Sequence, residues 1–421
     1  ADDAHALAPL ATFTILAGDD LGNGFERTDL GDHGVGLYDR EHGRVHVLAP
    51  PSLDYTTGVV ALDGTPTKTL WELSLDERLN HRQVLADGER REYVRDVLGL
   101  SLVRTTDAIK PYNSPDHVAV DQDAALLDAV RDRHGERPAV ISTAAAEAAY
   151  NDAGVLDDLV DGSKHYGNVL GSNEFKERRL GVVIGSNHYG DGFVKKIGAY
   201  AGETVERAEG AKGADLSYTG LGDDVLRHMR EHETLQAAMR FGRDGNGAVV
   251  YVHTDTLPEW VPVAGEGRVL KTWSDGQRAV LDAVRDLDRR DDPAGDDGWT
   301  TRDVVDHPAV SIGERQVRDH LHDLVDRGYL DVETDAPGSG FRWIDGELHR
   351  VSDHGDVELD AIALDDLDDD ESAELSRSSI YTWEFRRSPG ERSSLAVEAE
   401  RSASDPGVEA GRPPDHAGDP G

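Results

Sequence analysis

The sequence predicts an α/β fold, in which helices cover a largely parallel β-sheet. Two continuously apolar runs, Leu180-Gly-Val-Val-Ile184 and Ala248-Val-Val-Tyr-Val-His253, are typical of strands buried on both faces. Segments with helical spacing of apolar residues separate such runs, over 124–133 and over 223–239. Alternation of strands and helices favours parallel pairing, because each helix returns the chain to the same edge of the sheet.

The composition is strongly acidic. Asp and Glu number 83 against 44 Lys and Arg, which gives a formal charge of −39, and only eight residues are lysine. We expect such a surface in a protein that works in concentrated salt, where repulsion between carboxylates is screened. An acidic protein that avoids or mimics nucleic acid is the alternative. At 421 residues the chain is long enough for two or three domains.

Some classes of protein are excluded. The chain has no cysteine, so it has no disulfide, thiolate metal site or cysteine nucleophile. No apolar run reaches the length of a membrane span, and the N-terminus lacks the regions of a signal peptide. We therefore expect a soluble, cytoplasmic protein that has no membrane partner. The sequence begins Ala1-Asp2-Asp3 without Met, so we expect a processed or truncated product.

The N-terminal stretch is predicted to form short strands. Runs of β-forming residues at Thr12-Phe-Thr-Ile-Leu16 and Arg44-Val-His-Val-Leu48 lie between turn residues. We interpret Asp39-Arg-Glu-His42 as a hairpin turn rather than a metal-and-ATP box. Gly58-Val-Val-Ala-Leu62 is predicted to be a buried strand, followed by a helix over 69–85. A further strand and an extended linker are expected up to Val120.

Hydroxyl-bearing and glycine-rich loops lie at the ends of predicted strands, and the one at 171–173 precedes the strand at 180–184. Such loops suit ligand binding, since they lie at a sheet edge and expose amide and hydroxyl groups to phosphate oxygens. A simple turn is the alternative at each position, and a metal site from His165 and His188 has no supporting ligand spacing. The candidate residues are Thr65 and Pro66 after the first strand, Ser142 and Thr143 after the strand over 137–143, and Gly171, Ser172 and Asn173.

The most informative stretch is Gln236-Ala-Ala-Met-Arg240-Phe-Gly-Arg243. It ends a predicted helix just before a predicted strand, so that both arginines are presented at a helix-to-strand corner. Guanidinium binds phosphate through paired hydrogen bonds and never deprotonates, which suits a phosphate-binding site. Ordinary surface charge at the end of a helix is the alternative.

This stretch resembles motif VI of superfamily 2 helicases, with Met239 where the family usually has Gly. The loops at 65–66, 140–143 and 171–173 are similar to motifs III, IV and V and occur in the family's order. The chain also resembles helicase-like proteins of haloarchaeal plasmids and proviruses. The resemblance implies a RecA-like second lobe over 121–262 after a remnant of the first lobe over 1–115. It implies DNA or RNA as partner and catalytic roles for Gln236, Arg240 and Arg243.

The loop that holds the phosphates of ATP in this family is missing. It requires Gly-x-x-x-x-Gly-Lys-Ser/Thr, and no Gly-Lys pair occurs in this chain. We therefore expect ATP and Mg²⁺ as cofactors only if the missing lobe is supplied, for example by a separate chain. No protein metal site is expected.

The C-terminal third is predicted to contain a winged helix over 270–350. Three amphipathic helices are followed by a hairpin with a turn at 335–340, and Ser311-Ile-Gly-Glu314 has the spacing of a capping box. Arg315, Arg318 and Arg342 are the expected DNA contacts, although the unit would also serve as a packing module. Residues 353–421 are expected to form an acidic, largely disordered tail. A non-enzymatic winged-helix regulator with an inert RecA-like scaffold is the alternative function.

Overall fold

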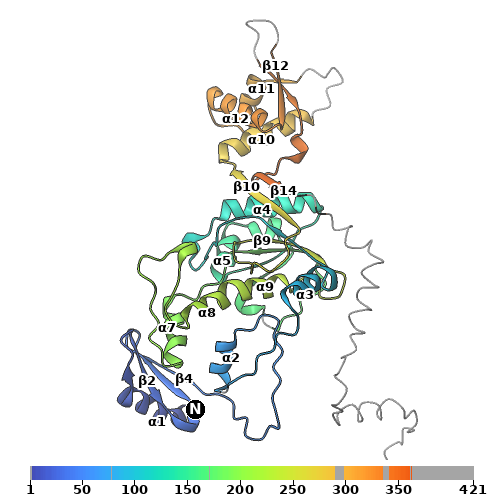
Figure 1. Ribbon diagram of the computed structural model, residues 1–421. Helices are drawn as coiled ribbons and strands as arrows, with labels where there is room; N and C mark the ends of the chain where they lie inside the picture. Colours follow the sequence, from blue (N-terminus) through green and yellow to red (C-terminus); the bar gives the residue numbers. More distant parts are fainter. Residues whose placement is uncertain are drawn as a thin grey trace, which may run out of the picture. The chain divides into compact units, whose positions relative to one another are not determined.

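The computed structural model describes residues 2–76, 78–169, 171–289, 298–334, 341–360 and 362 (Figure 1). Its main feature is a seven-stranded sheet with the order β14-β10-β5-β9-β8-β6-β7. Every neighbouring pair is parallel except β10 and β14, which are antiparallel. The predicted α/β class is therefore confirmed, and the sheet is compatible with a RecA-like fold. The strands are β5 Leu100–Arg104, β6 Ala139–Ser142, β7 Ser163–His165, β8 Leu180–Ile184, β9 Ala248–His253, β10 Gly265–Thr272 and β14 Gly355–Leu359.

Helices cover both faces of this sheet, so that its central strands are buried on two sides. Val249 and Tyr251 of β9 pack against α4 (Val120–His134), α5 (Ala144–Asp152) and α6 (Val155–Leu159). Val250 and Val252 face the opposite way, toward α9 (Glu233–Ala238) and the π-helix η2 (Tyr93–Val97), which continues α3 (Asp87–Glu92). In Figure 1, α4 lies above the sheet and α9 and α3 lie below it. The alternation follows from the two-residue period of a strand.

A nearly continuous helical segment leads to the arginine corner. It consists of α8 (Gly222–Arg227), the π-helix η6 (His228–His232) and α9, and it joins β9 through a short turn. Gly242 in this turn has φ 60°, and a Cβ there would lie 2.4 Å from the Gly247 carbonyl carbon. The corner therefore requires glycine at this position.

The N-terminal residues form an antiparallel sheet with the order β1-β2-β3-β4, packed against α7 (Asp191–Tyr200). Its elements are α1 Asp2–Ala17, β1 Asp19–Asp20, β2 Phe25–Asp29, β3 Val35–Asp39 and β4 Arg44–Leu48. The predicted strand at 44–48 and the turn at 39–42 are confirmed. The predicted strand at 12–16 is wrong, because these residues continue α1.

The predicted strand at Gly58–Leu62 is also wrong. These residues have no regular structure and pair with no described strand, and Val60 and Leu62 are 87% and 88% exposed. An apolar run forms a strand only where other strands offer hydrogen bonds, and none is offered here. The helix that follows, α2, is shorter than predicted and spans Lys68–Leu75.

Three strands of the main sheet lie outside the predicted second lobe: β10 follows the predicted end at 262, and β5 and β14 lie in other predicted parts. β5 pairs with both β9 and β10, so the strand assigned to the remnant of the first lobe is central to the sheet. Residues 355–359, assigned to the tail, form edge strand β14, and the rest of the predicted tail after Ile362 lies outside the described residues. Both errors have one cause, since a short strand carries no signal of which sheet it joins.

Between β10 and β14 the chain forms a smaller unit with its own core. It contains α10 (Asp275–Asp288), β11 (Trp299–Thr300), α11 (Thr301–Val305), α12 (Glu314–Asp326), β12 (Leu330–Thr334) and β13 (Phe341–Asp345), with sheet order β11-β13-β12. The expected helices and hairpin occur, while the turn at 335–340 lies outside the described residues. The predicted capping box is wrong, because α12 begins at Glu314 with Gly313 as its N-cap. Capping boxes occur instead at Ser274 with Gln277 and at Thr300 with Asp303.

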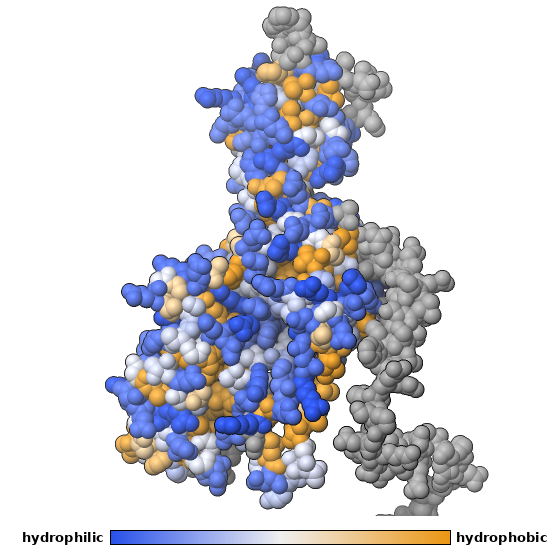
Figure 2. Space-filling model, in the orientation of Figure 1, coloured by the Kyte–Doolittle hydropathy of each residue, from blue (hydrophilic) through white to orange (hydrophobic). Residues whose placement is uncertain are grey.

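The remaining short helical turns are η1 Gly31–His33, η3 Pro115–His117, η4 Tyr166–Asn168, η5 Gly213–Asp215 and η7 Leu348–Arg350. Figure 2 shows hydrophilic side chains over most of the visible face of the molecule, with apolar patches between them. This agrees with the acidic composition.

Candidate functional site

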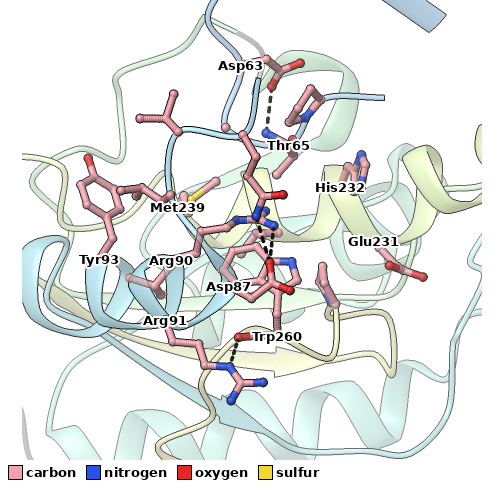
Figure 3. A pocket seen from close by; sticks show the side chains of 18 of the residues that line it. Asp63, Thr65, Asp87, Arg90, Arg91, Tyr93, Glu231, His232, Met239 and Trp260 are labelled. Atoms are coloured by element: carbon pink, nitrogen blue, oxygen red, sulfur yellow. Dashed lines mark hydrogen bonds and ion pairs between the residues drawn. The ribbon is translucent and has the colours of Figure 1, made fainter. Parts of the chain in front are cut away.

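A cavity of about 860 Å³ lies beside the helix that leads to the arginine corner. Its walls are the loop Asp63–Pro66, residues 81–94 of the loop and helix before β5, one face of η6 and α9, and the segment 257–260 after β9. Figure 3 shows the Thr65 loop at the top of this cavity and Trp260 at the bottom, with Arg90 between them. Four segments that are distant in sequence therefore enclose one space.

Two residues that the sequence singled out separately are in direct contact at this cavity. The Gln236 side-chain amide donates a hydrogen bond of 2.5 Å to the Thr65 hydroxyl. Thr65 is buried, and its backbone amide is held by the exposed carboxylate of Asp63. Pro66 lines the cavity next to Thr65. The loop before α2 is thus joined to α9, and Arg240 follows Gln236 by about one helical turn.

A second contact fixes the same loop to the π-helix. The Thr67 hydroxyl lies 3.0 Å from Nδ1 of His228 and 3.0 Å from Nδ1 of His232. A hydroxyl donates one hydrogen bond and accepts another, so one imidazole accepts from Thr67 and the other donates to it. Burial lowers the pKa of both imidazoles, that of His232 to about 4, with a smaller contribution from the neighbouring His228. Both rings are therefore neutral near pH 7.

On the opposite wall, a cation covers an aromatic ring. The Arg90 guanidinium lies 3.6 Å from the centre of the Trp260 ring, and Arg91 donates from Nε to the Trp260 carbonyl. Asp87 lies 3.5 Å from Arg90. The cavity wall between these residues and Thr65 is apolar, and consists of Val94, Leu235, Met239 and Leu257.

Arg240 and Arg243 lie at the corner, at the amino ends of the central strands. Arg240 is half-buried and donates to the Ser172 carbonyl at 3.4 Å, which brings the 171–173 loop to the corner. Burial, and then repulsion from Arg243, lowers the pKa of Arg240. Arg243 is exposed. Within the described residues neither guanidinium is paired with a carboxylate.

The other loop residues have different surroundings. Ser142 and Thr143 are buried at the carboxyl edge of the sheet, where Ser142 donates to the Ile184 carbonyl and Thr143 donates to the Tyr112 carbonyl while capping α5. Both hydroxyls are therefore used to hold the fold. Gly171 and Asn173 are exposed in the loop before β8, and Gly171 has φ 73°.

The arginines expected to contact DNA are not equivalent. Arg315 is exposed at the start of α12, whereas Arg318 is paired with Glu314 at 2.9 Å. Arg342 is half-buried on β13, opposite Glu333 and Thr300 on the neighbouring strands. Of the three, Arg315 is the most accessible to a partner.

Sequence reasoning missed Arg90, Trp260 and the two imidazoles. A signal for His228 and His232 was present, because their four-residue spacing places both on one helical face. It also missed a buried cluster at the carboxyl edge, where Asp123 lies 3.0 Å from Lys110 and accepts from Tyr150 at 2.8 Å.

The fold and the cavity define an α/β protein with an arginine-lined, partly apolar cavity below a mostly parallel sheet. No protein-family model matches this chain, and neither the curated proteins nor the solved structures contain a match. Among the described residues there is no group of three or more His, Asp or Glu placed to hold a metal ion. No helix in the described part of the chain has the length and apolar character to cross a membrane.

Proposed function

We propose that this chain is the nucleic-acid-binding, C-terminal portion of an ATP-dependent helicase or translocase of superfamily 2. In this proposal Arg240 and Arg243 face the phosphates of a nucleotide whose other contacts come from a first lobe. DNA or RNA is the partner, and ATP and Mg²⁺ are bound only when that lobe is present, in the same or a separate polypeptide.

One observation carries the proposal: among the described residues, two neighbouring guanidinium groups lack carboxylate partners, although the sequence has 83 acidic residues. Other arginines of the same region are paired, as Arg178 is with Asp161. Two unpaired cations that repel each other cost free energy, and a bound polyanion would offset that cost. The order of the motifs supports the same proposal, as does the Gln236–Thr65 contact between the segments that resemble motifs VI and III.

The proposal is tested by calorimetric titration of inorganic triphosphate. The wild type should bind this anion weakly through the two guanidinium groups alone, without the contacts that a first lobe gives to ATP and Mg²⁺. Arg240→Gln/Arg243→Gln should bind at least about tenfold more weakly still, because two forked donors are lost. Arg178→Gln is the matched control, since it removes a nearby arginine that is already paired with Asp161. Equal affinity in the wild type and the double variant would overturn the phosphate-facing role.

A second candidate function is a winged-helix DNA-binding regulator with an inert scaffold. The observation in its favour is the helix and strand order of residues 275–345, together with the exposed Arg315 on α12. In this case duplex DNA binding would fall in Arg315→Ala/Arg318→Ala and would not change in Arg240→Gln. Binding that is unchanged in the former variant would exclude this function.

A further inference from the structure

We propose that the 860 Å³ cavity holds one unpaired nucleotide of a single-stranded nucleic acid, with its base stacked on Arg90 and Trp260. This inference rests on the proposed function, which it deepens by naming the form of the nucleic acid and the side chains that bind it.

The first argument is the platform. The Arg90 guanidinium carbon lies over the Trp260 ring, 3.6 Å from its centre, which is the distance of a close cation–π contact. Guanidinium planes and indole rings are the surfaces on which unpaired bases stack in proteins that bind single strands. Figure 3 shows the Arg90 side chain between the Thr65 loop and Trp260, and it lines the cavity. A base that enters would therefore meet the platform directly.

The second argument is the chemistry of the remaining walls. Leu235, Met239 and Leu257 offer apolar contact to the edge and face of a base. Glu231 and His232 offer hydrogen bonds from the helix, and burial raises the pKa of the Glu231 carboxyl. A ligand with a flat apolar face and polar edges fits these walls, and this is the chemistry of a nucleobase.

The third argument concerns the phosphate. Arg82, Arg91 and Arg227 line the cavity in addition to Arg90. Arg91 bonds only to the Trp260 carbonyl through Nε, and Arg82 has no ion-pair partner within the described residues. Cations at the mouth of an apolar cavity suit a phosphate that is covalently joined to the buried base.

The fourth argument is the charge of the whole chain. A formal charge of −39 repels any polyanion, so long-range attraction cannot supply the affinity. Stacking and hydrogen bonding inside a cavity remain effective in high salt, where phosphate contacts weaken. The cavity is large enough for one unstacked nucleotide, and a base can enter it only after it has left its pair and its stack, which favours single strands over duplexes.

The experiment measures fluorescence anisotropy of a short labelled single-stranded oligonucleotide with the full chain, over a range of KCl concentrations. Trp260→Ala should weaken binding by about tenfold or more, as is usual for loss of a stacking contact, and Arg91→Gln should weaken it by a similar factor, because a phosphate contact is lost. Trp260→Tyr should retain most of the affinity, which shows that the ring and not the fold is responsible. Arg95→Gln is the control, because Arg95 lies one turn from Arg91, is paired with Asp96 and does not line the cavity.

Each remaining outcome contradicts the inference. If the wild type binds the strand and the cavity variants bind it equally well, the cavity is not the site, although the proposed function stands. If the matching duplex binds as tightly as the strand, the selection for unpaired bases is wrong. If a free nucleoside monophosphate binds as tightly and displaces the strand, the ligand is a free nucleotide. If no oligonucleotide binds at any salt concentration, the proposed function fails as well.

Discussion

At the scale of single residues, the contact of Thr67 with two imidazoles explains how an irregular loop is held in place. The Thr65–Thr67 loop has no strand beside it, yet Thr65 and Thr67 are both buried. Gln236, His228 and His232 supply the hydrogen bonds that a sheet would otherwise provide. The position of the loop therefore depends on both histidines staying neutral.

This dependence predicts a loss of stability in acid. The folded-state pKa of His232 is about 4, below its ordinary value, so the unfolded chain binds more protons between about pH 4 and pH 6.5. Stability contributed by the neutral ring is present above this window and is lost as pH falls through it. We expect the free energy of unfolding to fall by about 1 kcal/mol across this window, a small value because the ring is partly exposed to solvent. Urea unfolding across the window should be less pH-dependent in His232→Gln.

His33→Gln is the control for this measurement, because His33 is exposed on the N-terminal sheet unit and should leave the pH dependence unchanged. The same pH dependence in His232→Gln as in the wild type would show that the Thr67 contact does not stabilise the fold.

Residue patterns predicted part of the candidate site. Thr65, Gln236 and Arg240 were identifiable because each lies in a short segment with a recognisable chemical role. The Arg90–Trp260 contact was not identifiable, since it joins helix α3 to an irregular segment about 170 residues away, and their meeting depends on tertiary packing. No local pattern encodes such a contact.

At the scale of elements, β10 and β14 bracket the smaller C-terminal unit. β14 completes the sheet, and its Val357 and Leu359 pack against the core on the α4 side. Arg327 and Tyr329 of the smaller unit both bond to Asp356 of β14. The sequence assigned β14 to an acidic tail. This strand instead packs on the core of the main sheet and bonds to the smaller unit.

We predict that Val357→Asp lowers the free energy of unfolding by about 2 kcal/mol, because a carboxylate replaces an apolar contact with the core. The measurement is the urea midpoint of the full chain. Glu358→Gln is the matched control, since its side chain points to solvent from the same strand. Equal midpoints for Val357→Asp and the wild type would mean that β14 contributes nothing to the sheet.

Element prediction succeeded where a segment has neighbours to pair or pack with and failed where it has none. The helices α4, α10 and α12 and the strands β6, β8 and β9 were evident from their periodicity. The run at 58–62 was apolar enough for a strand but had no neighbour to pair with. Strand formation is a property of a pair, so one segment alone cannot specify it.

At the scale of the whole molecule, the net charge of −39 dominates the response to salt. Mutual repulsion of carboxylates opposes the compact state, and dissolved ions screen it. We predict that the melting temperature rises steadily from about 0.2 to about 2 M KCl, as measured by circular dichroism. A melting temperature that stays constant or falls over this range would show that repulsion is not the main effect of the acidic composition.

The absence of a Gly-Lys pair predicts that the chain alone has no nucleic-acid-stimulated ATP hydrolysis. Nothing in the sequence matches the loop that holds the β and γ phosphates. Release of phosphate from ATP should therefore stay at background with or without single-stranded DNA. Turnover that disappears in Arg240→Ala would contradict this expectation.

The central claim is that the arginine corner and the nucleic-acid cavity act as one unit, connected by the helix and the Gln236–Thr65 hydrogen bond. The most direct test is the affinity for a single-stranded oligonucleotide with and without saturating triphosphate, at matched ionic strength. Coupled sites change each other's affinity, by about fivefold or more in typical cases. We predict such a change in the wild type and little or none in Gln236→Leu, whereas the same affinity with and without triphosphate in the wild type would contradict the claim.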